Sequence, residues 1–208
     1  MLTLGIDTSN YATSLAVFDT DAGEVVCDCK KFLPVKEGQL GLRQSDALFH
    51  HTTALPVMLA ELGSKADLTK VEAVGVSAKP RPVEGSYMPC FLAGVSAATA
   101  FALSRGLPLF GLTHQQGHIA AALYAAGDFT LFEREALVFH VSGGTTDLLL
   151  CHGAKNITRW APATIFTRGK PSTGWASNWV FRSRRASMSA SRPPSVPRKS
   201  APRSLCAA

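Results

Sequence analysis

The stretch THQQGHI at residues 113–119 opens an alanine-rich run that extends to Ala126. Its two histidines, His114 and His118, are four residues apart, so on an α-helix they lie one above the other. Thr113 is a residue type suited to capping the start of such a helix. Both imidazoles can then reach one ion, because neutral imidazole is the commonest protein ligand for metals such as zinc and iron. Taken alone, the pair is more typical of surface or core histidines; the surrounding motifs favour a metal site.

A strand, a polar turn and a returning strand open the chain. Met1 to Ile6 is apolar, a turn of small polar residues follows, and Thr13 to Phe18 reads as the second strand. Hydroxyls and backbone N–H groups in such a turn can hold a phosphate, with the carboxylate near a metal ion or water. The turn alone is weak evidence, since similar turns are widespread. The predicted nucleotide-binding or substrate-binding residues here are Asp7, Thr8 and Ser9.

The same layout returns after Gly127. Ala136 to Val141 is predicted to be a strand, residues 142–147 a turn, and Leu148 to Cys151 the returning strand. Glycines in the turn let the backbone approach a phosphate closely, although an ordinary glycine hairpin explains them too. A repeated strand, hydroxyl-rich turn and strand is typical of a two-lobed nucleotide clamp. The predicted phosphate-binding residues of this turn are Ser142, Gly143, Gly144 and Thr145.

Further strands and helices are expected between the two hairpins. Glu24 to Phe32 reads as a third strand, and Ser45 as the N-cap of a helix that ends near Leu62. Pro56 should kink this helix or mark its restart. The adjacent His50 and His51 point in different directions on it. We expect them to be surface or substrate-facing residues, not a ligand pair.

An α/β arrangement follows from the next segments. Val71 to Ser77 is a predicted buried strand, Phe91 to Ser104 a small-residue helix, and Leu107 to Leu112 a short strand. The loop at 78–87 follows a strand's carboxyl end, where α/β sheets place their ligands. Three charged residues lie in this loop, Lys79, Arg81 and Glu84. They could contact an anionic substrate or simply be solvated, and the sequence favours neither interpretation.

Charge divides the chain near residue 160. The 208 residues carry 21 Lys and Arg, 15 Asp and Glu, and a net charge of +6. Nine of the basic residues and none of the acidic ones lie beyond residue 159, which leaves 12 basic and 15 acidic residues, a net charge of −3, in residues 1–159. The body is therefore mildly acidic, and the final segment alone makes the protein basic.

The segment after residue 159 has two interpretations. It contains all three tryptophans followed by Ser, Pro and Arg without helical or strand period, which is typical of a disordered basic arm able to touch nucleic acid. Alternatively, codons shifted by one base allow Ile165 to Ala186 to read LHAGQAIDRVGVQLGLPFPAG, a string with regular apolar spacing. We favour a frameshift near Arg159, which the nucleotide sequence would decide.

Five cysteines without a CxxC motif indicate a reducing compartment, and no leader or membrane-length apolar run is apparent. A cytoplasmic protein without membrane association is expected.

With both turns and the histidine pair in place, the chain resembles the ASKHA superfamily of actin, hexokinase and Hsp70-like folds. Within it, the chain resembles tRNA N6-adenosine threonylcarbamoyltransferases, long called M22 glycoproteases or O-sialoglycoprotein endopeptidases. The residues that carry this are GIDTS at 5–9, HQQGHI at 114–119 and VSGGTT at 141–146. The expected fold is an α/β, RNase H-like N-terminal lobe plus the beginning of a second lobe. The expected units are residues 1–127, 128–159 and a basic, disordered tail at 160–208.

The resemblance implies a function. In that family two histidines and a distant aspartate hold iron or zinc, and the N6 amine of adenosine 37 in tRNA attacks threonylcarbamoyl-adenylate. Carried over, His114 and His118 would be ligands, Ser142, Gly143 and Gly144 would lie by the phosphates, and tRNA and partner proteins of threonylcarbamoylation would be the partners. No catalytic residue is assigned.

Departures from the family pattern indicate a divergent branch. The usual opening glutamate and Cys-Asp-Glu run are replaced by Asp7 and Asn10-Tyr11-Ala12, and residues 79–85 replace a Gly-Pro-Gly loop. No carboxylate follows residue 159 to serve as the third ligand, so weak metal binding and impaired activity are expected. Alternatives are a metallopeptidase, for which no HExxH glutamate is present, a non-catalytic nucleotide-binding or partner-binding module, and a small-molecule kinase using Asp7 or Asp147.

Overall fold

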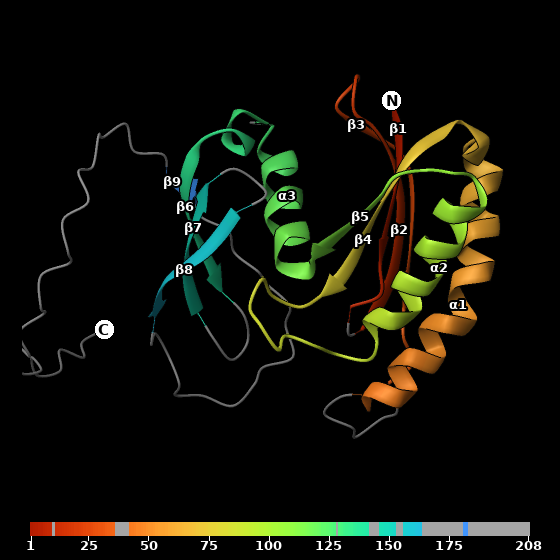
Figure 1. Cartoon of the computed structure of the whole chain (residues 1–208), viewed down its shortest axis with the longest axis horizontal. Helices are drawn as coiled ribbons and strands as arrows, with labels where there is room; N and C mark the ends of the chain where they lie inside the picture. Colours follow the sequence, from red (N-terminus) through yellow and green to blue (C-terminus); the bar gives the residue numbers. More distant parts are fainter. Residues whose placement is uncertain are drawn as a thin grey trace, which may run out of the picture.

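A five-stranded mixed sheet forms the first half of the molecule (Figure 1). The computed structural model describes residues 1–9, 11–35, 42–127, 129–141, 146–152, 156–163 and 181–182. The sheet has the order β3-β2-β1-β4-β5, in which β1, β2 and β3 are antiparallel neighbours and β1, β4 and β5 run parallel. Its strands are β1 (Leu2–Asp7), β2 (Ala12–Asp19), β3 (Glu24–Phe32), β4 (Val71–Lys79) and β5 (Leu109–Thr113).

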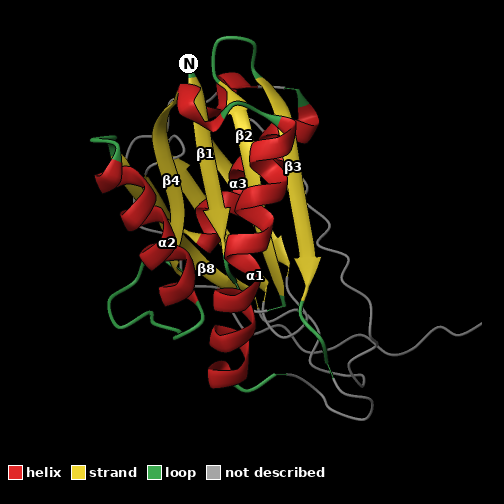
Figure 2. Ribbon diagram, turned by 90° about the vertical axis from the view of Figure 1, so that its right-hand side faces the viewer, coloured by secondary structure: helices red, strands yellow, loops and turns green. Residues whose placement is uncertain are grey.

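Two helices cover one face of this sheet. Helices α1 (Gln44–Lys65) and α2 (Phe91–Ser104) lie side by side across the strands in Figure 2, and a 3-10 turn, η1 (Leu68–Lys70), leads into β4. The core between helices and sheet is apolar and buried, as alternation along β1, β2 and β4 requires. Its members include Leu4, Ile6, Leu15, Val17, Met58, Leu62, Val74, Val76, Ala98 and Ala102.

The opposite face of the sheet carries α3 (His114–Ala126), which lies between two sheets (Figure 1). Tyr124 of α3 contacts the first sheet, because its ring meets Phe18 edge-on at 5.9 Å between centroids and its hydroxyl accepts a hydrogen bond from Val25 N at 3.4 Å. Ile119 and Leu123 instead join a second apolar cluster with Val138, Leu149, Cys151 and Ile157. One helix thus contributes to both halves.

The second sheet has the order β8-β7-β6-β9, with all neighbours antiparallel. A 3-10 turn, η2 (Phe129–Phe132), connects α3 to it. Its strands are β6 (Glu135–Val141), β7 (Thr146–His152), β8 (Asn156–Ala163) and β9 (Phe181–Arg182). Strand β8 continues through residue 160, where the basic tail was expected to begin. Apart from β9, residues 164–208 lie outside the described part, so the disordered-tail and frameshift hypotheses stay predictions.

The predicted α/β class, with a first mixed sheet followed by a second sheet, is confirmed. The first sheet combines an antiparallel β1-β2-β3 meander with two parallel strands reached through helical crossovers. Parallel neighbours need such crossovers, because a tight hairpin can join only antiparallel strands. The strands expected at 1–6, 13–18, 24–32 and 71–77 are all present, and α2 has the predicted bounds.

One local prediction for α1 was wrong. Arg43, not Ser45, is the N-cap, and the Ser45 hydroxyl instead lies 3.3 Å from the Asp46 carboxylate. The helix runs through Pro56 without a restart, so of the two predicted effects of this proline only the kink stays a prediction. Proline removes one backbone N–H donor from the helix. The buried side chains of Ala54, Leu55 and Met58 on either side of it keep this segment packed on the sheet.

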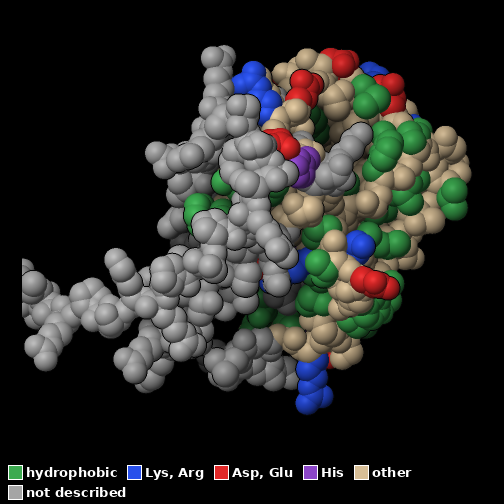
Figure 3. All heavy atoms as spheres, turned by 60° about the vertical axis from the view of Figure 1, so that its left-hand side comes forward, with side chains coloured by type: hydrophobic (Ala, Val, Ile, Leu, Met, Phe, Trp, Pro, Cys, Tyr) green, Lys and Arg blue, Asp and Glu red, His purple; other side chains and the backbone are tan. Residues whose placement is uncertain are grey.

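The exposed surface is mixed in character. On the face drawn in Figure 3, hydrophobic side chains lie among both basic and acidic side chains, and the coloured part of this face is not uniformly basic. Among the described helices, none is both long and apolar enough to cross a membrane. Cys27, Cys29, Cys90 and Cys151 are free thiols.

Candidate functional site

The two histidines of α3 face each other. His114 Nε2 and His118 Nε2 are 2.8 Å apart, and their ring centroids are separated by 4.2 Å with the planes at 72°. Thr113 caps the helix as predicted: its hydroxyl accepts a hydrogen bond from Gln116 N, while the Gln116 side chain accepts one from Thr113 N. This capping box fixes the first turn, and therefore the direction of His114. The pair converges on one point, as its spacing predicted.

Asp7 holds His114 from the other side. Its Oδ2 lies 2.9 Å from His114 Nδ1 and accepts a hydrogen bond from the Ser77 hydroxyl, while its Oδ1 accepts one from Ser9 N at 2.7 Å. Burial alone would raise the pKa of Asp7, but the hydrogen bond and charge of His114, with the Ser77 and Ser9 bonds, outweigh it and hold this pKa well below its ordinary value. Asp7 is thus an ionised acceptor.

An ionised Asp7 selects one tautomer of His114. If Nδ1–H of His114 donates to Asp7, Nε2 is the ring nitrogen left to face His118 and a ligand. Burial, followed by the neighbouring His114 and His140, lowers the pKa of His118 to about 4, so this imidazole is neutral at pH 7. Neutral rings with a carboxylate behind the ligating nitrogen are the usual form of metal-binding histidines.

The donor set fits a metal ion in part. Two ring nitrogens meet, and one ring already has its outer carboxylate partner. Across the described residues, however, no group of three His, Cys, Asp or Glu side chains is placed to share one ion. A complete site normally has at least three protein ligands. The residues present therefore account for two ligands of a metal centre and for the support of one.

His140 and Ser77 complete the surroundings and were not predicted. The His140 ring on β6 lies 6.3 Å from that of His118, and burial lowers the pKa of His140. Ser77 ends the buried part of β4, the parallel neighbour of β1, so its hydroxyl reaches Asp7 at the common edge of the sheet. The parallel pairing of β1 and β4 could therefore have predicted that Ser77 lies near Asp7. Nothing in the local sequence marks His140.

The predicted phosphate-binding turns have different outcomes. Thr8 is fully buried, and its hydroxyl donates to Cys90 O and accepts from Gly94 N, so it ties β1 to α2; its role in binding a ligand stays a prediction. Ser9 offers its backbone N–H to Asp7. Ser142, Gly143, Gly144 and Thr145 lie outside the described residues, and their role as phosphate-binding residues stays a prediction.

The loop after β4 joins the two halves beside the histidines. Arg81 Nη1 lies 3.7 Å from Asp147 Oδ2 on β7, and Pro80 O accepts a hydrogen bond from Gln115 N in the first turn of α3. Asp147 is therefore a buried strand residue and not part of the predicted turn. Its ion pair shows that Arg81 contacts the second sheet, whereas Lys79 and Glu84 are exposed.

The expectation for His51 was wrong. Its side chain is fully buried, with Nδ1 2.8 Å from the Thr13 hydroxyl and with Nε2 lacking a hydrogen-bond partner. Burial lowers the pKa of His51 to about 4. His50, on the adjacent side of α1, is half-buried and lines a small pocket. The two do point in different directions, but only His50 reaches the surface.

Comparison with known proteins identifies the family. The model of the family described as tRNA N6-adenosine threonylcarbamoyltransferase matches residues 22–164. Proteins of that name from Phytoplasma australiense and Thermotoga neapolitana are 35% and 30% identical to the chain over 150 and 149 residues, covering 70% and 72% of it. The chain spans only 42% and 43% of the length of these two relatives.

Solved structures give a weaker likeness. YeaZ from Pseudomonas aeruginosa is 14% identical, with a TM-score of 0.47, over 72% of this chain and 60% of that one. The family match itself covers β3 through β8, which includes the histidine pair and the second sheet except β9. The chain belongs to the tRNA N6-adenosine threonylcarbamoyltransferase family.

Proposed function

We propose that this protein transfers a threonylcarbamoyl group from its adenylate to N6 of an adenosine in tRNA, using a divalent metal ion, iron or zinc, held by His114 and His118. The convergence of the two Nε2 atoms at 2.8 Å, inside the region matched by the family, is the observation that supports it most. A surface histidine pair without function would not need the partly buried carboxylate of Asp7 behind one ring.

The proposed reaction is an acyl transfer. The N6 amine forms a bond to the carbamoyl carbonyl carbon, the bond from that carbon to the phosphate oxygen breaks, AMP leaves, and the amine gives up one proton. A bound metal would supply Lewis-acid polarisation of the acyl group and charge for the adenylate. Because the adenylate is already an activated acyl donor, no covalent nucleophile on the protein is needed, and correct positioning of the two reactants supplies much of the rate.

The chain's own residues orient the ligands. Asp7 accepts from His114 Nδ1 and is itself held by Ser77 and the Ser9 N–H, so the His114 ring has a defined tautomer and direction. Phe91 meets the His114 ring at 63° with 6.3 Å between centroids, which limits rotation of the imidazole. With two protein ligands placed, we expect weaker metal binding than at a three-ligand centre, and impaired transfer by this chain.

A metallopeptidase has less support. Such an enzyme needs a general base between or beside the two histidines, usually the glutamate of HExxH. Here Gln115 is buried with its backbone bonded to Pro80 O, and Gln116 is used in the capping box. Neither side chain can accept and return a proton. A chelator-sensitive cleavage of a glycoprotein would restore this alternative.

Metal binding and transfer should be measured together. The wild-type chain should bind zinc or iron at up to one ion per chain and lose it in His114→Ala and His118→Ala, whereas His152→Ala, a partly exposed histidine paired with Glu135, should not change it. Transfer from threonylcarbamoyl-adenylate to tRNA should fall with chelator. Stoichiometric metal in the His114→Ala/His118→Ala double variant would reject the metal assignment.

The non-catalytic alternative has its own readout. A module that only holds a nucleotide or a partner protein would bind without releasing AMP from the adenylate, and its binding would be the same in the two histidine variants. Hydrolysis or transfer from ATP alone, without the carbamoyl intermediate, would indicate a kinase instead.

A further inference from the structure

Phe32 ends β3 at the same edge of the sheet as the histidine site. It pairs with Ala12, the first residue of β2, while Asp7 at the end of β1 pairs with Ser14 two residues further along β2. The next residue continues this arrangement, since Leu33 N donates to Tyr11 O at 2.8 Å. The strand register therefore places Phe32 at the same edge of the sheet as Asp7, with only β2 between their two strands, and α3 begins at this edge.

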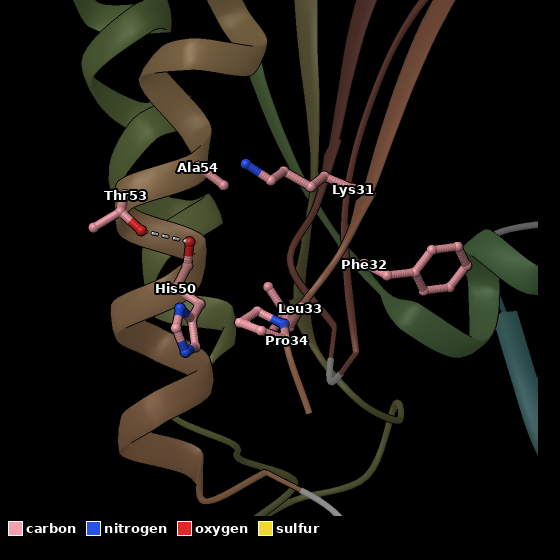
Figure 4. Close-up of a pocket in the computed structure, with 7 residues that line it drawn as sticks. All are labelled: Lys31, Phe32, Leu33, Pro34, His50, Thr53 and Ala54. Carbon is pink, nitrogen blue, oxygen red and sulfur yellow. Dashed lines mark hydrogen bonds between the residues drawn. The ribbon is translucent and has the colours of Figure 1, made fainter. Parts of the chain in front are cut away.

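The Phe32 side chain points to the side of the sheet opposite α1. Phe32 and its neighbours Lys31 and Leu33 border a small pocket with His50, Thr53 and Ala54, but Figure 4 shows the Phe32 ring directed away from the other lining side chains. Alternation along a strand puts Lys30 on the same face as Phe32. Ala12, the partner of Phe32, shares a face of β2 with Phe18, whose ring meets Tyr124 of α3, so this face is the side of the sheet that carries the histidine helix.

Phe32 is an exposed aromatic ring with a cation against it. Its residue exposure is 71%, and Lys30 Nζ lies 5.0 Å from the ring centroid. A single exposed phenylalanine is unremarkable in itself. Asp28 and Lys30, which precede Phe32 on this face of β3, are charged and exposed, so along the described strand the ring adjoins charged side chains and not an apolar stripe.

We propose that Phe32, with Lys30 behind it, stacks on an unpaired base of the RNA acceptor and holds the neighbouring nucleotide beside the histidine pair. The proposal rests on the proposed tRNA-modifying function. Single-stranded RNA loops are recognised by bases stacked on aromatic side chains, with lysine or arginine on the phosphates. An exposed ring with Lys30 against it supplies both elements on a body that is otherwise mildly acidic.

Variants at Phe32 and a matched phenylalanine test the stacking. Phe49 is similarly exposed, at 64%, but lies on α1 across the sheet. With an unmodified anticodon stem-loop RNA as the probe, Phe32→Ala should weaken binding about tenfold, Phe32→Trp should retain it, and Phe49→Ala should leave it unchanged. Lys30→Gln should reduce the salt dependence of binding by roughly one counterion. All four variants should keep the wild-type melting temperature, since the replaced side chains are exposed.

Kinetics separates this inference from the proposed function. Phe32→Ala should raise the KM for tRNA with little change in the KM for the adenylate. Equal RNA affinity of the Phe32→Ala and Phe49→Ala variants would overturn the stacking role while leaving the transferase proposal intact. A wild-type chain that neither binds the stem-loop nor modifies tRNA would overturn the proposed function, and this inference with it.

Discussion

The Oδ2 atom of Asp7 lies 2.9 Å from Nδ1 of His114, across 107 residues of chain. This bond connects the carboxyl end of β1 to the first turn of α3, and it directs Nε2 of His114 towards His118. The site is thus built from two elements that only the folded sheet brings together.

Replacing Asp7 should weaken metal binding without removing either ligand. Loss of a carboxylate behind a ligating histidine typically costs 10- to 100-fold in affinity, so we expect Asp7→Ala in roughly this range and Asp7→Asn, whose amide oxygen still accepts from Nδ1, to lose less. Zinc titration against a competing chromophoric chelator measures this. Asp46→Asn, an exposed carboxylate on α1, is the control, and equal affinities of all three variants would contradict the role of Asp7.

The cap of α3 should matter for stability and for the site. Thr113→Ala removes the hydroxyl that accepts from Gln116 N and should cost about 1 kcal/mol of unfolding free energy, whereas Thr113→Ser should restore most of it. Because His114 is the first helical residue, the same change should also lower metal affinity. Urea unfolding and metal titration of the two variants would show whether both effects follow the hydroxyl.

His51 should make the fold sensitive to acid. Its pKa of about 4 in the folded protein lies below the ordinary 6.5, so between these values the unfolded chain binds more protons. The resulting stability is fully present above pH 6.5 and is lost as pH falls towards 4, by roughly 3 kcal/mol in total. Chemical unfolding at several pH values would measure the slope.

A paired apolar replacement is the control for His51. The Thr13→Val/His51→Leu double variant removes both hydrogen-bonding partners and should flatten the slope between pH 6.5 and 4, while Thr13→Val alone should cost about 1–3 kcal/mol by leaving buried Nδ1 unpaired. An unchanged slope in the double variant would assign the acid sensitivity to other groups, such as His118 and His140, whose pKa values are also lowered.

Gly94 should tolerate no side chain. A Cβ placed there would come within 2.7 Å of the Thr8 hydroxyl oxygen, which also accepts from Gly94 N. Gly94→Ala should therefore destabilise the fold by about 1–3 kcal/mol. Gly117→Ala in α3 meets nothing within 4 Å and should instead stabilise by up to about 1 kcal/mol, because alanine is the better helix former. Thermal melts of both variants would compare the two positions.

Much of the first lobe follows from the sequence because its signals are local. The alternation in β1 and β2, the alanine-rich composition of α2 and the Thr113 cap each depend on residues close together in the chain. The facing of His114 and His118 is local too, since one helical turn decides it. Ser45 failed as a cap because several polar residues at 43–46 compete to start the helix.

The rest of the site depends on contacts between distant elements. His51 belongs to the buried stripe of α1, which also contains Ala47, Ala54, Leu55 and Met58. The helical spacing of these positions predicts that His51 is buried, whereas the polarity of its side chain predicts exposure. The proximity of His140 to His118 requires knowing how the second sheet covers α3, which no spacing within either segment encodes.

The sharing of α3 between two cores has a mechanical consequence. Ile119 and Leu123 pack α3 into the apolar cluster of the second sheet, whereas Asp7, the partner of His114, belongs to β1 of the first sheet. A hinge movement that opens or closes the two halves would therefore strain the hydrogen bond between Asp7 and His114. Substrate entry between the halves would in this way change the relative position of the two histidine rings.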